Sequence, residues 1–126
     1  MKITLAIALG GALGAVARHL VGAQMLHLFG SRIPWGTLTV NIVGSFVMGV
    51  LVELMALKIE VPQEMRAFLT VGVLGGFTTF SAFSLEVALL YERGDPLLAG
   101  LYVLVSVAAS VGGLFAGLWM VRALVA

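Results

Sequence analysis

The chain has 126 residues, of which 61% are hydrophobic and 10% are charged, whereas a soluble globular domain usually has about 25% charged residues. A soluble fold of this length cannot bury so much apolar surface, and a net charge of +1 does not favour nucleic-acid binding. The chain has no cysteine, which excludes disulfides, thiol nucleophiles and thiolate metal sites. We therefore expect an all-α membrane protein in a lipid bilayer.

Four membrane-spanning helices are expected, in one transmembrane domain that covers residues 1–126. Charged residues separate apolar stretches of roughly 20 residues, the length that crosses a bilayer. Pro34 and Pro96 suit the first position of a helix, and Asp95 is a suitable N-cap for the last one. The expected spans are about 3–28, 34–57, 63–91 and 96–121.

Lysine and arginine are divided between the two ends of such a bundle, so the positive-inside rule gives only a weak orientation. Lys2, Lys58, Arg66 and Arg122 fall at one end, and Arg32 and Arg93 fall at the other. Insertion both ways up and a single orientation with a cytoplasmic N-terminus both remain open.

Pairs of glycines four residues apart recur on three of the expected helices. Such spacing lets helix backbones approach closely in lipid, where no hydrophobic effect drives them together. The pairs are Gly10 with Gly14, Gly72 with Gly76, and Gly113 with Gly117. Tight helix packing follows, and since four helices have little room to enclose an aqueous path, a two-fold homodimer is the simplest expectation.

Two stripes of polar side chains run along helices two and four, with four-residue spacing that places each stripe on one face. They are Thr37, Asn41 and Ser45, and Tyr102, Ser106 and Ser110. A hydroxyl in a membrane helix often bonds only its own backbone. An amide cannot be satisfied in this way, so Asn41 requires a partner or a permeant, and the matched stripes favour a polar path.

The charged residues near the spans are few. Arg18 either faces an entry vestibule, where it would attract anions, or extends to the lipid headgroups. Glu53 and Glu86 are interpreted as solvated carboxylates near the ends of their helices. We expect no acidic residue in the middle of the membrane, which argues against a proton-coupled cation transporter.

The third span contains a poor helix interior at Gly75-Gly76-Phe77-Thr78-Thr79, where we expect a break in mid-membrane. Unwound carbonyls must meet protein, water or an ion, so a structural cation is a reasonable hypothesis there. Phe77, Phe80 and Phe83 follow on one side. They either pack or present their positive ring edges to an anion, with hydroxyls from Ser81 and Ser84.

Three motifs together resemble the Fluc/CrcB fluoride channel family along nearly the whole chain. They are Gly10 to Arg18 (GGALGAVAR), Pro34 to Leu38 (PWGTL) followed by Asn41, and Gly75 to Ser81 (GGFTTFS). His19 and Ala82 depart from the residues that are frequent at their positions in the family. Neither departure removes a residue of the site.

The resemblance implies a passive, fluoride-selective channel that exports fluoride across a bacterial-type inner (plasma) membrane. It implies an antiparallel dual-topology homodimer with two pores and a central structural sodium ion (Na+). The carbonyls of Gly75 and Thr78 from both subunits would hold the sodium ion, and Arg18 would sit in a vestibule. The implied pore residues are Asn41 as anion donor, Phe80 and Phe83 as aromatic walls, and Tyr102, Ser106 and Ser110 as a polar track.

A small dual-topology multidrug or cation exporter is the main alternative function, because it shares the size and the possible topology. Such an exporter requires a titratable acid on helix one, where the polar interruption instead begins with basic Arg18. A structural membrane subunit is a further alternative. An enzyme is not expected, because no nucleophile, base and orienting group can be assembled from these spans.

Overall fold

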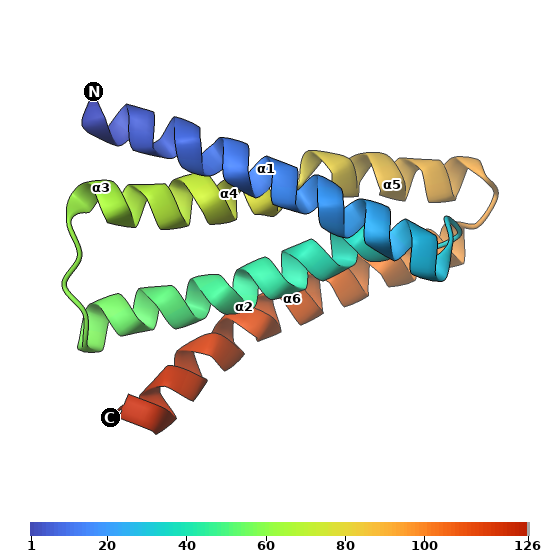
Figure 1. The fold of residues 1–126 in the computed structure, drawn as a ribbon. Helices are drawn as coiled ribbons and strands as arrows, with labels where there is room; N and C mark the ends of the chain where they lie inside the picture. Colours follow the sequence, from blue (N-terminus) through green and yellow to red (C-terminus); the bar gives the residue numbers. More distant parts are fainter. Residues whose placement is uncertain (126) are drawn as a thin grey trace.

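The computed structural model describes residues 1–125 and is all-helical (Figure 1). Its elements are α1 (Lys2–Phe29), α2 (Trp35–Leu57), α3 (Gln63–Arg66), the π-helix η1 (Ala67–Leu74), α4 (Gly75–Phe77), α5 (Ser81–Glu92) and α6 (Pro96–Val125). They provide four helices that are long and apolar enough to cross a membrane, the third running from Gln63 to Glu92. The expected fold class is confirmed at this level, and α6 runs about one turn past its expected end.

The helices are arranged as two pairs that diverge toward one end of the molecule (Figure 1). In one pair α1 packs along η1 and α4, and in the other α2 packs along α6. The N-terminus, the loop after α2 and the end of α6 lie at the open end. The loops at 30–34 and 93–95 lie at the opposite end, where α5 packs against α6.

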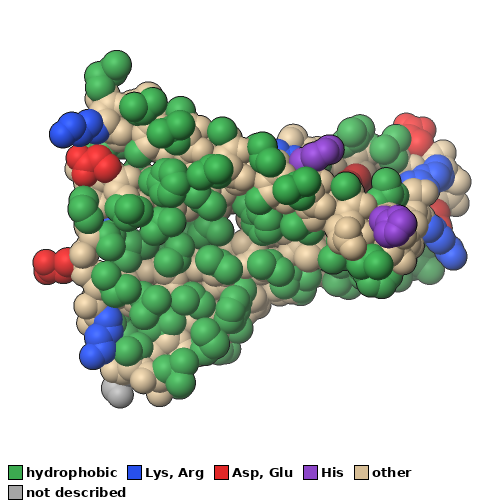
Figure 2. Space-filling view, viewed as in Figure 1, with side chains coloured by type: hydrophobic (Ala, Val, Ile, Leu, Met, Phe, Trp, Pro, Cys, Tyr) green, Lys and Arg blue, Asp and Glu red, His purple; other side chains and the backbone are tan. Residues whose placement is uncertain are grey.

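The side chains are distributed as a membrane-spanning bundle requires. Figure 2 shows hydrophobic side chains over most of the visible face and charged side chains gathered mainly at its two ends. Large apolar residues on every long helix are exposed, among them Leu13, Val43 and Leu104. The four long apolar helices and their exposed apolar surface indicate a multi-pass membrane protein.

The glycine pairs lie where two helix backbones meet. A Cβ atom added at Gly10 would lie 2.5 Å from the Phe68 carbonyl oxygen, and one added at Gly76 would lie 2.6 Å from that of Gly11. Real Cβ atoms rarely approach so closely, so alanine cannot replace these residues without a shift. The predicted tight packing is confirmed. The structure shows that these glycines bring the backbone of α1 close to the backbone of the third span.

The third span is interrupted, but later than the sequence suggested. Gly75 has helical dihedral angles, with φ −62° and ψ −38°, and the helix continues to Phe77. The chain turns extended at Thr78, with φ −86° and ψ 161°, and becomes helical again at Ser81. The expectation that the break includes both glycines was wrong, because Gly76 serves the close approach to α1 while remaining in the helix.

Glu53 is not a solvated carboxylate as expected. Glu53 is 8% exposed, and its carboxylate forms an ion pair with Arg122. The pair joins the last part of α2 to the last part of α6, so the buried Glu53 charge has a cationic partner.

Candidate functional site

The interruption of the third span is held by the side-chain amide of Asn41 on α2. The Asn41 Nδ2 group donates to the Thr79 carbonyl oxygen at 2.9 Å, and the Thr79 N–H donates to Asn41 Oδ1 at 2.8 Å. This reciprocal pair satisfies both backbone polar groups of Thr79, which lies where the helix is interrupted. The partner that the sequence required for Asn41 is thus the backbone of the break.

Two carbonyl groups at the break lose the donors that a continuous helix would give them. The Thr79 N–H, which would donate to the Gly75 oxygen, bonds Asn41. The Ala82 N–H, which would donate to the Thr78 oxygen, bonds the Thr79 hydroxyl at 3.2 Å. Gly75 and Thr78 both line a cavity, and neither carbonyl keeps the donor that a continuous helix would give it.

This cavity has a volume of about 400 Å³ and lies between α2, the break, α5 and α6. We call it the central cavity. Its lining residues are Asn41, Ser45, Gly75, Thr78, Thr79, Phe80, Phe83, Ser106, Val107, Ser110 and Val111. The structure therefore brings together residues of both polar stripes with two of the three phenylalanines.

Ser106 and Ser110 present buried hydroxyl groups to the central cavity. Within residues 1–125, neither hydroxyl has a hydrogen-bond partner. Most serines in membrane helices bond the carbonyl one turn back, and these two do not. A buried donor without a partner costs about 1–3 kcal/mol, so the arrangement favours a ligand that accepts hydrogen bonds.

The phenylalanines form an aromatic wall on α5. The ring centroids of Phe80 and Phe83 are 5.6 Å apart, and those of Phe83 and Tyr102 are 5.2 Å apart. Phe83 is 8% exposed, whereas Phe80 is 77% exposed. Phe77 lies before the break and approaches Gly44 on α2, so it does not continue the stripe into the central cavity.

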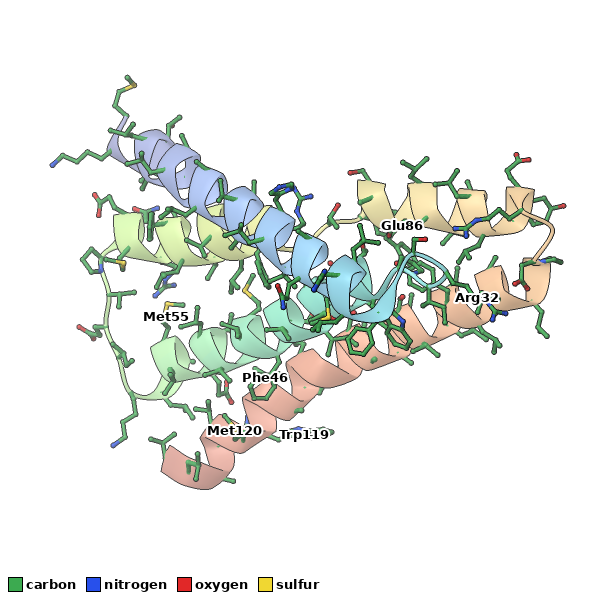
Figure 3. The ribbon with its side chains drawn as sticks, turned by 45° about the vertical axis from the view of Figure 1, so that its right-hand side comes forward. Arg32, Phe46, Met55, Glu86, Trp119 and Met120 are labelled. Carbon is green, nitrogen blue, oxygen red and sulfur yellow. The ribbon has the colours of Figure 1, made fainter. Side chains whose placement is uncertain are left out.

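Thr37 and Tyr102 meet at a residue that sequence analysis did not assign to the site. The Thr37 hydroxyl donates to Glu86 Oε2 at 2.9 Å, and the Tyr102 hydroxyl donates to Glu86 Oε1 at 3.0 Å. Glu86 is partly buried on α5 and points toward α2 and α6 (Figure 3). The expectation of a solvated carboxylate was wrong, and its position one helical turn after Phe83 was the available signal.

Arg18 approaches the break from α1. Its Nε group donates to the Gly76 carbonyl oxygen at 3.1 Å. The guanidinium therefore supplies a donor near the end of α4, where the carbonyl end of a helix dipole favours a cation. Arg18 also lines a second cavity of about 370 Å³ together with Thr37 and Thr79.

Ser81 and Ser84 do not take part in the central cavity. Both are exposed, and the Ser84 hydroxyl donates to the Phe80 carbonyl oxygen at 3.0 Å. Ser84 is thus bonded to its own helix, which is the structural alternative for a membrane serine.

The amino-acid sequence of the chain is similar to those of known proteins. Residues 5–118 match the sequence profile of the family described as CrcB-like protein, Camphor Resistance (CrcB). The chain belongs to the CrcB family. The resemblance drawn from its three motifs is therefore confirmed.

Relatives of this CrcB-family chain match it over all or nearly all of its length. It is 59% identical over all of both chains to a protein of Rhodospirillum centenum named fluoride-specific ion channel FluC. A protein of Chelativorans sp. with the same name is 54% identical over 94% of each chain. A third, from Agrobacterium fabrum, is 53% identical over 92% of this chain and 93% of its own.

Proposed function

We propose that this protein is a passive, fluoride-selective channel, as the names of its relatives suggest. The observation that carries the proposal is the pair of unpartnered hydroxyls, on Ser106 and Ser110, that face the central cavity beside Phe83. These groups provide hydrogen-bond donors without a positive charge. Uncharged donors suit rapid conduction, because they replace part of an anion's hydration without holding the anion too strongly.

The aromatic wall adds to this environment. A phenyl ring has a positive edge and a negative face, so Phe80 and Phe83 can interact with an anion through their edges. Asn41 completes the set. One hydrogen of its Nδ2 group is taken by Thr79, and the second remains to donate to an anion in the central cavity.

The channel is proposed to be an antiparallel, dual-topology homodimer with two pores. Two features support a partner subunit: Phe80 is 77% exposed and Gly75 is exposed, although both line the central cavity. A second copy would cover them and complete the wall. Four lysine or arginine residues at one end against two at the other give only a weak orientation bias, which is compatible with insertion in both orientations.

A structural sodium ion is proposed at the two-fold axis, held by the carbonyl oxygens of Gly75 and Thr78 from both subunits. Oxygen ligands suit a hard cation, and these carbonyls have lost their helical donors. Bound sodium would supply positive charge where two breaks cross. Replacing sodium by a bulky organic cation during purification should lower activity, and full activity without sodium or another small cation would remove this part of the proposal.

We place the channel in a bacterial-type inner membrane, where it would let cytoplasmic fluoride leak outward. Fluoride enters an acidified cell as neutral HF and is trapped inside as the anion. The membrane potential then drives the anion out through a passive path, at about 2.3 kcal/mol per elementary charge per 100 mV.

The test is efflux from liposomes that hold the purified protein. Liposomes loaded with potassium fluoride or potassium chloride receive a potassium ionophore, and an electrode follows the released anion. Fluoride release with little chloride release is expected. Protein that is folded and dimeric by gel filtration but releases no fluoride would contradict the proposal.

A further inference from the structure

The second cavity that Arg18 lines adjoins the central cavity at the break. It has a volume of about 370 Å³, and we call it the α1-side cavity. Residues of α1 and of the start of α2 line it together with Thr79 and Ala82 of the third span. Because Thr79 also lines the central cavity, the two cavities meet where the proposed path of the anion passes the break.

The charge of the α1-side cavity comes from α1 alone. Among the described residues that line the cavity, only Arg18 and His19 can carry a charge, and in both the charge is positive. The parts of α2 and of the third span that line it contribute no carboxylate. Glu86 accepts the Thr37 hydroxyl but lines a different cavity, beside the 30–34 loop. A cleft with one sign of charge concentrates ions of the opposite sign, so the α1-side cavity favours anions.

Arg18 and His19 differ in what controls their charge. The Arg18 guanidinium is charged at every relevant pH, and its Nε group donates to the Gly76 carbonyl oxygen at 3.1 Å. His19 follows Arg18 directly and is exposed. Histidine is the side chain that ordinarily changes its charge between about pH 5 and about pH 8. The positive charge of the α1-side cavity therefore has a constant part from Arg18 and a part from His19 that depends on pH.

We propose that His19 makes the collection of anions by the α1-side cavity depend on pH. The inference rests on the proposed fluoride channel and adds a regulatory residue to it. At acid pH the protonated His19 ring adds a positive charge beside Arg18 and raises the local concentration of fluoride at the break. As the pH rises, this charge is lost and Arg18 alone remains. Fluoride conduction is thus faster in acid, the condition in which neutral HF enters a cell.

The single-channel fluoride conductance in a planar bilayer tests this proposal, because it does not depend on the amount of protein. Recording at about 10 mM salt, where the Debye length is about 30 Å, keeps screening weak. The wild-type conductance should be about threefold higher at about pH 5.5 than at about pH 8. His19→Gln stays neutral and should give the lower, alkaline value at both pH values. His19→Lys stays positive and should give the higher, acid value at both.

His27→Gln is the matched control for these variants. His27 is also exposed on α1 but is not among the residues that line the α1-side cavity, so this variant should keep the wild-type pH dependence. Equal wild-type conductance at the two pH values, or a pH dependence that persists in His19→Gln, would overturn the proposal. If His19→Gln does not fold, the neutral variant His19→Phe takes its place with the same expectation. Folded, dimeric wild-type protein without fluoride current at either pH would instead contradict the proposed function.

Discussion

Asn41 and Thr79 bond each other twice, and this pair joins α2 to the extended segment of the third span. The Asn41 amide bonds the N–H and the carbonyl of Thr79, as a neighbouring strand does for an extended residue in a β-sheet. Without it, the Thr79 N–H and carbonyl would lose these hydrogen-bond partners, at a cost of about 1–3 kcal/mol for each group. The position of the break is thus determined on α2 as much as on the third span itself.

The Asn41→Asp substitution should therefore open the break. It removes the donor to the Thr79 oxygen and places a carboxylate oxygen against that carbonyl. We expect a loss of stability of about 1–3 kcal/mol and a loss of most fluoride efflux. Thermal unfolding in detergent and liposome efflux measure the two effects. Gln24→Glu, the same chemical change at an exposed site on α1, should alter neither stability nor efflux. Unchanged stability in Asn41→Asp would contradict the stabilising role of the Asn41–Thr79 pair.

Substitutions at Ser106 and Ser110 should lower fluoride efflux without lowering stability, unlike the substitution at Asn41. Replacing either by alanine removes a buried hydroxyl that has no partner in residues 1–125, so no protein hydrogen bond is lost. Stability should stay equal or rise by about 1 kcal/mol, while fluoride efflux falls. Ser84→Ala, which removes a bonded hydroxyl outside the central cavity, is the control for efflux. A clear loss of stability at Ser106 or Ser110 would assign these hydroxyls to packing.

Phe83→Ile tests whether the aromatic wall acts on the anion or only fills space. Isoleucine remains large and apolar but has no positive ring edge. Efflux should fall at least about tenfold, which corresponds to about 1.4 kcal/mol, with dimerisation intact by gel filtration. Phe80→Ile should have the same effect. The control is Phe115→Ile, which changes an exposed ring on α6 that is tilted by 41° against the Trp119 ring. Wild-type efflux in Phe83→Ile would show that the aromatic wall serves only packing.

Gly76→Ala tests the close contact between α1 and the third span. The added methyl would lie 2.6 Å from the Gly11 carbonyl oxygen, so the two helices must move apart. Overpacking of this kind costs about 1–3 kcal/mol, and the movement should also disturb the break that follows. Gly112→Ala is the matched control, because nothing lies within 4 Å of an added methyl there. Equal melting temperatures for the two variants would contradict the packing described for α1.

The sequence was sufficient for the fold class, because four apolar stretches and their flanking prolines depend on local composition. It also predicted as pore residues Asn41, Phe83, Ser106 and Ser110, which the structure brings to the lining of one cavity. It misplaced the break because a glycine pair can either unwind a helix or allow close packing. Only the neighbouring helix decides between the two, and here Gly76 packs against Gly11 on α1.

Long-range pairing explains the remaining differences. Glu53 and Glu86 looked solvated by their place along the chain, yet their partners lie 69 and 49 residues away, at Arg122 and Thr37. The hydroxyls of Ser81 and Ser84 were predicted to accompany the phenylalanines, and the sequence could not show that Ser84 bonds the Phe80 carbonyl. Such pairings depend on how the helices cross, which no pattern within one helix records.

The cavity between α2, the break and α6 is proposed to conduct fluoride and to reject chloride. The most direct test is the reversal potential of purified protein in a planar bilayer, with fluoride salt on one side and chloride salt on the other. We expect a current whose reversal potential lies close to the equilibrium potential of fluoride. A reversal potential that follows chloride or the cation, or folded protein that carries no current, would contradict it.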